Sequence, residues 1–218
     1  MGGRARMSQT GLNYRHDLDE AFAALRSDLI DDSGPKISTM RNYRFAIVPY
    51  DPVEEFPLRR KLSGLAHELE HTGWTVLSLS LQELMLKRLE EMGAQTLERL
   101  IAREKKLYTA SPERAFNYVQ SRVSRTLEGP DGLAGDISAL IAAEVETRPE
   151  AMERAVVFLN RAGALYPFMR LSALLKHLDG HTHNVPVILF YPGRRTEDGL
   201  SFMDQMPPDR DYRPRIYP

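Results

Sequence analysis

Apolar residues form four short runs that are typical of β-strands. The runs cover residues 44–50, 74–81, 155–160 and 185–191. The last two runs are almost continuous in apolar residues, as in strands of parallel sheets that helices cover on both faces. We therefore expect one parallel sheet of about four strands, with Val156 to Leu159 and Val187 to Phe190 in its interior.

Between these runs, apolar residues recur every three or four positions, which predicts amphipathic helices. One helix is expected over residues 17–30, and another is expected to start at Pro167 and to end at Leu178. The stretch 82–154 has helical periodicity without a strand signal, so it should be a helical insertion between the second and third strands. One apolar stripe in this stretch comprises Phe116, Val119, Val123 and Leu127.

Single strands that alternate with helices imply right-handed crossovers and an α/β fold. The layering expected is P-loop-NTPase-like or Rossmann-like, although the sequence has no Walker motif. Residues 1–14 are polar and lack periodicity, so we expect a flexible tail there. Residues 15–218 are expected to form a single α/β domain, with 82–154 as its helical insertion.

Composition removes several chemistries. The 218 residues include no cysteine, which excludes disulfides, thiol nucleophiles and cysteine-ligated metals. The net charge is −1, so no global field favours nucleic acid, and strong DNA binding by the protein alone is not expected. No apolar run approaches the roughly 20 residues of a membrane helix. A cytoplasmic protein without membrane attachment is the expectation.

The sequence His67-Glu68-Leu69-Glu70-His71 matches the H-E-x-x-H zinc-protease pattern. The apolar stripe of the same helix contains Leu58, Leu62, Leu65 and Leu69. At about 100° per residue, His67 and His71 lie on the opposite, solvent-facing side. A catalytic metal needs a sheltered site, so a metal bound by His67, Glu68 and His71 is rejected.

The carboxyl ends of the strands carry a candidate anion site, because ligands of parallel sheets bind at that edge. Its residues are Asp51, Arg161, Gly163, Gly193 and Arg194. Backbone amides at a helix start together with the arginines could hold a phosphate. The alternative for Asp51 is helix capping, with Pro52 at the first helical position and Glu54 completing a capping box. Lone glycines usually just make turns.

Three further clusters have ordinary explanations. His177, His181 and His183 bracket Gly180 at an expected helix end, where cations need no catalytic role. The segment 212–217 interleaves aromatic residues with arginines, and a packed tail or edge strand is favoured over base stacking. From residue 99 to 125, seven Lys or Arg stand against two acids, which makes this region the better candidate surface for nucleic acid or an acidic partner.

Four segments together resemble the BrxB family of BREX bacteriophage-exclusion systems. They are residues 45–59, 158–170, 186–193 with 199–203, and 212–217. The most specific feature is Gly-x-x-Tyr-Pro followed by Phe-Tyr-Pro-Gly, and the resemblance extends over about residues 41 to 218. Arg161-Ala162 stands where many relatives have a further glycine, which weakens a phosphate loop at this position.

The resemblance implies a role in phage defence as a small α/β protein without established catalysis or cofactor. It implies that the protein works with the alkaline-phosphatase-like component PglZ, as a non-catalytic adaptor, and with other BREX proteins. A homodimer is compatible with the sequence. The alternative function is a nucleotide- or phosphate-binding enzyme module at the carboxyl edge of the sheet. Partner-binding candidates, each of which could equally pack locally, are Tyr108, Tyr118, Arg122, Tyr212 and Arg213.

Overall fold

A computed structural model describes residues 18–30, 36–37, 44–210, 212 and 214–218. The tail expected over residues 1–14 and the candidate Arg213 lie outside these residues. The α-helices are α1 (Leu18–Leu29), α2 (Glu55–His71), α3 (Leu81–Glu91), α4 (Ala94–Ala110), α5 (Pro112–Leu127), α6 (Leu133–Thr147) and α7 (Leu171–Leu178). The 3-10 helices are η1 (Pro52–Glu54), η2 (Pro149–Arg154) and η3 (Ala162–Leu165). The strands are β1 (Phe45–Tyr50), β2 (Thr75–Ser80), β3 (Ala155–Asn160), β4 (Val187–Thr196), β5 (Gly199–Phe202) and β6 (Arg215–Ile216).

The strands form one sheet in the order β2-β3-β4-β1-β6, and every pair along this path is parallel. The predicted α/β class and the parallel pairing of the four expected strands are confirmed. β4 continues beyond the apolar run and turns back into β5, which pairs with it antiparallel. The short β6 adds to the other side of β1. β6 lies in the segment 212–217, where a packed tail or edge strand was expected, whereas β5 has no apolar run and was not predicted.

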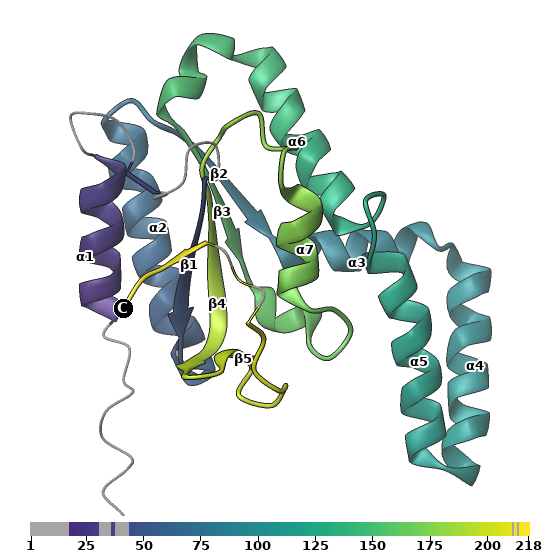
Figure 1. Ribbon diagram of the computed structural model, residues 1–218. Coiled ribbons are helices and arrows are strands. Elements are labelled where there is room, and N and C mark those ends of the chain that lie inside the picture. The colour runs from purple at the N-terminus through teal and green to yellow at the C-terminus, as the bar shows by residue number, and fades with distance from the viewer. Residues whose placement is uncertain (1–17, 31–35, 38–43, 211, 213) are drawn as a thin grey trace, which may run out of the picture.

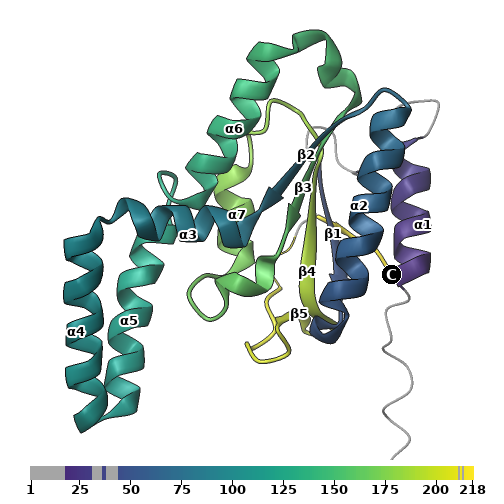
Figure 2. The same ribbon diagram turned by 180° about the vertical axis from the view of Figure 1, so that it is seen from behind.

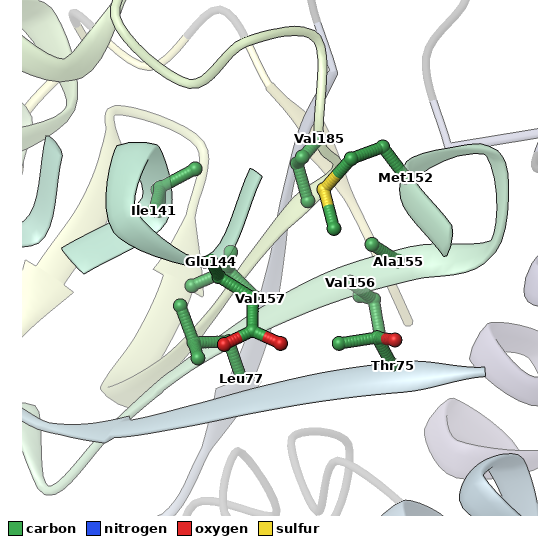
Figure 3. A pocket seen from close by; sticks show the side chains of 9 residues that line it. All are labelled: Thr75, Leu77, Ile141, Glu144, Met152, Ala155, Val156, Val157 and Val185. Carbon is green, nitrogen blue, oxygen red and sulfur yellow. The ribbon is translucent and has the colours of Figure 1, made fainter. Parts of the chain in front are cut away.

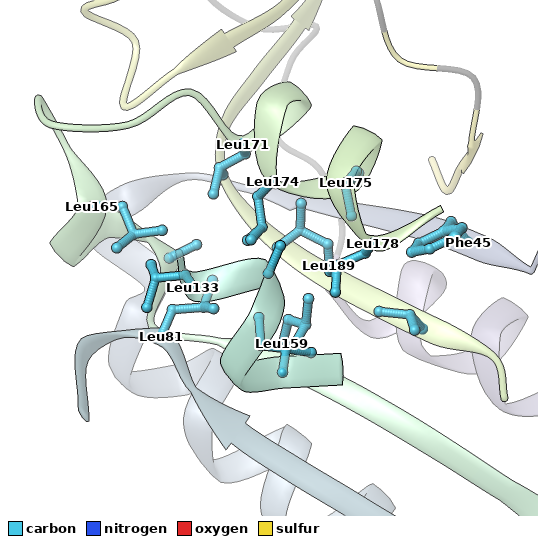
Figure 4. Packing of buried hydrophobic residues seen from close by; sticks show 14 of the residues in the cluster. Phe45, Leu81, Leu133, Leu159, Leu165, Leu171, Leu174, Leu175, Leu178 and Leu189 are labelled. Atoms are coloured by element: carbon cyan, nitrogen blue, oxygen red, sulfur yellow. The ribbon is translucent and has the colours of Figure 1, made fainter. Parts of the chain in front are cut away.

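Helices cover both faces of the sheet (Figure 1). Residues of α1 and α2 pack on one face, where Phe158 and Phe190 meet edge-to-face at 5.6 Å and Phe22 of α1 stacks on Phe190. The other face packs against α6, α7 and the ends of α3 and α5. On that side, the leucines of α7 lie over Leu159 and Leu189 (Figure 4). Because β3 and β4 contribute alternate residues to both clusters, nearly every side chain of the predicted interior is buried.

The expected helical insertion consists of α3, α4, α5, α6 and η2. Its middle part, α4 with α5, forms an antiparallel hairpin that projects away from the sheet (Figures 1 and 2). No residue of α4 is buried, whereas α5 buries Ala115, Val123 and Leu127. The free end of the hairpin points toward the end of the molecule where the parallel strands finish. None of the helices in the described part of the chain is long and apolar enough to cross a membrane.

Arg88 of α3 holds the base of this hairpin in place. Its guanidinium forms a two-pronged hydrogen bond with Asp136 of α6, with a distance of 2.9 Å from Nη2 to Oδ1. The same side chain donates to the carbonyl oxygens of Thr126, at 3.2 Å, and Asp131. One planar group therefore joins α3, the end of α5 and the start of α6.

The predicted helix start at Pro167 is wrong. The chain first makes η3 and then a turn over 166–168, in which the amide of Phe168 donates to the carbonyl of Leu165 at 2.7 Å. Tyr166 is extended, with a ψ of 134°, which is the conformation that a residue before proline prefers. The α-helix begins only at Leu171.

The double-sided burial of β3 can be tested with Phe158→Ala. This ring is fully buried between β4 and the helices, so its removal should lower the free energy of unfolding by about 3–5 kcal/mol. Urea denaturation measures the change. The matched control is Phe116→Ala, because that ring is 49% exposed. A loss for Phe158→Ala within about 0.5 kcal/mol, the range of ordinary surface substitutions, would contradict the two-sided packing.

Arg88→Ala should cost about 2–3 kcal/mol, because Asp136 and two carbonyl oxygens lose a charged donor. Arg88→Lys keeps the charge but not the planar fork, so the stability of this variant should lie between that of the wild type and that of Arg88→Ala. Denaturation midpoints and limited proteolysis of the 92–131 region report the change. Wild-type resistance to protease in Arg88→Ala would show that the hairpin base is held by other contacts.

Candidate functional site

The exposed apolar residues of the α4–α5 hairpin lie together on one side. Ile101, Tyr108 and Phe116 are 49%, 59% and 49% exposed, and we call them the tip patch. Ile101 and Tyr108 are seven residues apart, so they share one edge of the α4 stripe. Phe116 continues the face of α5 that contacts the body further along. Both helices are right-handed and they run in opposite directions. The α4 face with Ile101 and Tyr108 and the α5 face with Phe116 therefore turn toward the same side of the hairpin.

Phe116 is exposed because α5 extends beyond the body. Further along the same face, Gln120 donates to the carbonyl of Pro167 at 2.9 Å, and Ser124 donates to that of Phe168. The buried Val123 and Leu127 follow on this side. The stripe predicted from Phe116 to Leu127 is therefore real, but its first residue has nothing to cover it within the described chain. Phe116 is exposed because the apolar stripe of α5 is longer than the body it packs on, which only the structure shows.

The hairpin is also the most basic part of the chain. Residues 94–127 contain seven Lys or Arg and three Glu, which gives this segment a net charge of +4 in a chain of net charge −1. All seven cations are exposed. Among the described residues, none of them forms an ion pair. The tip patch is therefore set in a positive field with unneutralised charge.

The other partner-binding candidates fall in different environments. Tyr118 is half-buried in α5, and the guanidinium of the exposed Arg122 lies over its ring at 5.6 Å. Tyr212 packs edge-to-face on Tyr191 with ring centroids 5.6 Å apart, which is the local packing left open from the sequence. Of the four candidates that the structure describes, Tyr108 and Arg122 are the two with exposed side chains.

At the carboxyl edge of the sheet, the charged residues of the candidate anion site have local partners. Asp51 accepts a hydrogen bond from the amide of Val53 at 3.0 Å and so caps η1. Arg161 donates to Gln82 at 3.0 Å and lies 3.8 Å from a carboxylate oxygen of Glu83. Arg194 pairs with Asp204 at 3.3 Å. A phosphate at this edge would have to compete with these contacts.

Of the two glycines of the candidate anion site, Gly163 allows η3 to approach the turn after β5, and Gly193 allows β4 and β5 to lie close together. A Cβ atom on Gly163 would lie 3.2 Å from the sulfur of Met203, and one on Gly193 would lie 2.0 Å from the carbonyl oxygen of Ser201. Gly193 also has a φ of 140°, which favours glycine. Close packing between segments accounts for both residues.

One apolar cavity lies between the amino-terminal ends of β2 and β3 and the helix α6 (Figure 3). Its walls include Leu77, Ile141, Met152 and Val185, and its volume is about 10 Å³. That is about the space that a single water molecule requires. This cavity is a packing defect rather than a site for a nucleotide or another small molecule.

His67 and His71 are exposed on α2, with their Nε2 atoms 2.9 Å apart. Glu68, the residue between them that would activate water in a zinc protease, accepts a hydrogen bond from Arg26 of α1 at 2.6 Å. This bond lowers the pKa of the Glu68 carboxyl. The described residues contain no group of three or more metal-ligating side chains. The Arg26–Glu68 bond ties α2 to α1.

Buried tyrosines predict a loss of stability at alkaline pH. Burial raises the pKa of Tyr212 to about 12, and burial also raises the pKa of Tyr50 and Tyr191. The same phenols ionise near pH 10 in the unfolded chain. The neutral buried tyrosines therefore contribute their full stabilisation below about pH 10. The free energy of unfolding should fall as the pH rises from there toward the pKa values of the folded protein. Urea midpoints at pH 8, 10 and 11 measure the slope, which Tyr191→Phe should reduce. A flat profile from pH 8 to 11 would contradict this prediction.

Comparisons with known proteins agree on one family. The profile of the BrxB family, described as BREX protein BrxB, matches residues 77–216, which is more than half of the chain. The BREX protein BrxB of Bacillus cereus (strain H3081.97) is 26% identical over 172 residues, covering 78% of this chain and 80% of that protein. No solved structure gives a significant match. From the matched profile, which takes in the insertion, β3, β4 and β6, we conclude that the chain belongs to the BrxB family.

Proposed function

We propose that the protein is a non-catalytic adaptor that binds a PglZ-like component of its BREX system through the α4–α5 hairpin. One observation carries the proposal: a rigidly based hairpin holds exposed apolar side chains in a positive field, away from the core. Burying Ile101, Tyr108 and Phe116 against a partner would remove three large apolar side chains from water.

Membership of the BrxB family implies a role in a BREX phage-defence system, and it suggests other BREX proteins as partners. A multi-protein system needs surfaces that hold its components together. Stable interfaces use a few aromatic and arginine anchors surrounded by a polar rim. Tyr108 and Phe116 have the character of anchors, and Arg114 and Arg122 have the character of a rim.

The charge of the hairpin specifies the partner surface further. Because its seven cations lack carboxylate partners within the described chain, an acidic surface on the partner would complement them. Exposed charges of this kind mainly raise the association rate and make it sensitive to salt. Binding should therefore weaken as the ionic strength rises, while the apolar patch supplies most of the residual affinity.

Phosphate or nucleotide binding at the carboxyl edge remains the second candidate. It ranks lower because Arg161 and Arg194 already contact Glu83 and Asp204. A thermal-shift screen with nucleotides and divalent metals separates the two functions, since a ligand at a hundredfold excess over Kd stabilises by about 2.7 kcal/mol. We expect no cofactor-dependent shift. That the isolated protein does not bind DNA strongly also stays a prediction, which a gel shift at physiological salt tests.

The adaptor proposal is tested by co-expression with the PglZ-like component, followed by affinity capture and size exclusion. The wild-type protein should co-elute with it at micromolar concentration. The double variant Tyr108→Ala, Phe116→Ala should weaken the complex by at least about tenfold, because it removes two anchors. Both residues are exposed, so the fold should keep its circular dichroism spectrum and melting temperature.

The matched control is Gln95→Ala, which changes an exposed residue at the base of the same helix. Its complex should be as strong as that of the wild type. Co-elution that survives the double variant unchanged would move the interface off the hairpin. Separate elution of the wild-type proteins at tens of micromolar would overturn the adaptor role itself.

A further inference from the structure

Strand β2 forms one edge of the sheet. Within the described residues it pairs with β3 alone, in a continuous register of six residue pairs. Alternate residues of an edge strand direct their N–H and C=O groups away from the neighbouring strand, where another strand can bind them. All six residues of β2 are at least partly exposed, and Ser78 is the most exposed of them. Figure 2 shows β2 as the strand nearest the viewer, with α2 on one side and α6 on the other.

The residues of β2 carry none of the features that usually protect an edge. The sequence Thr-Val-Leu-Ser-Leu-Ser has no charge, no proline and no bulge. The opposite edge differs, because β6 is two residues long, follows Pro214 and includes Arg215. Short strands, prolines and charges are the usual means of blocking strand addition. The β2 edge is thus the one suited to accept another strand.

The helix beside this edge has two distinct flanks. Lys61 and Glu68 pair with Asp19 and Arg26, so they mark the flank of α2 that faces α1. On the helical wheel, the flank opposite to these pairs contains Arg59, Ser63, Ala66 and Glu70. This flank faces the β2 side, because α2 contacts β2, whereas α1 lies toward the other edge, where its Asp28 pairs with Arg215 of β6.

The charges on this flank are self-complementary. Arg59 and Glu70 are both exposed, and neither has an ion-pair partner within the described chain. The Arg59 guanidinium only lies over the ring of Phe56, at 5.6 Å. Ser63 and Ala66 stand between the two charges and are small enough to let a second helix approach closely. An antiparallel copy of α2 would place its Glu70 opposite Arg59, and its Arg59 opposite Glu70.

We infer that a second copy of this chain occupies the β2 edge, in a dimer whose two-fold axis is perpendicular to the sheet. Such an axis pairs the two β2 strands antiparallel and keeps each face of the sheet continuous. In this pairing, residues that face each other across the two strands point to the same side of the sheet. The axis therefore passes between the two copies of one residue, such as Leu77 or Ser78. A short turn joins α2 to β2 and the two elements contact each other, so one axis near this edge can relate both pairs of elements. The two Arg59–Glu70 pairs flank the joined strands.

The proposal is tested by charge exchange, with the mass measured by light scattering during size exclusion. The wild-type protein should give twice 24.8 kDa at tens of micromolar and dissociate on dilution. Arg59→Glu should weaken the dimer by at least about tenfold, because it places like charges opposite each other twice. The double variant Arg59→Glu, Glu70→Arg restores opposite charges and should recover the dimer. Arg60→Glu, an exposed neighbour on another side of α2, is the matched control and should dimerise normally.

A steric variant and hydrogen exchange keep the test independent of charge. Ser63→Trp adds bulk at an exposed position, so it should fold normally but remain a monomer. The amides of residues 75–80 should exchange slowly in the wild-type dimer and faster in this monomer. A wild-type monomer at 100 µM would overturn the proposal. A dimer that resists both Arg59→Glu and Ser63→Trp would also overturn it, and protection of β2 only when another BREX protein is added would assign the edge to that protein instead.

Discussion

Strands β3 and β4 are buried on both faces, and the rest of the architecture depends on this constraint. A sheet of this kind must be covered twice, because leaving either face to water would expose a continuous apolar surface. α1 and α2 cover one face, and α6 and α7 cover the other with help from α3 and α5. The requirement accounts for every helix except α4, which buries no residue. The helix that is free of the core is therefore free to serve another purpose.

Hydrophobic patterning was sufficient for the central part of the fold. The near-continuous runs around Phe158 and Phe190 identified the interior strands, because only two-sided burial removes the alternation of polar residues. The absence of a strand signal from residue 82 to 154 likewise identified the insertion. These predictions succeeded because they depend on solvation along the chain, which is a local property of the sequence.

Features that depend on distant contacts could not be predicted in the same way. β5 pairs with an extension of β4 that contains Gly193, Arg194 and Arg195, and the two-residue β6 is held by its neighbours rather than by its own composition. Of the candidate site, the basic region was recognised from its charge. The exposure of Phe116 was not, since the periodicity of α5 gives no sign of where the body ends. Arg88 shows no pattern at all, because its three partner residues lie 38 to 48 residues further along the chain.

The orientation of the whole hairpin is fixed at its base by a single planar group, the guanidinium of Arg88. The α4 helix has 17 residues, so its arm is about 25 Å long at 1.5 Å per residue. Over that length, a rotation of about 10° at the base displaces the far end by about 4 Å, which is the diameter of a methyl group. A side chain fixed in two directions by Asp136 and in two more by backbone carbonyls resists such a rotation. The same contacts connect the hairpin to the core. A displacement of the hairpin at Tyr108 would therefore also shift α3 and α6, which pack on the buried sheet.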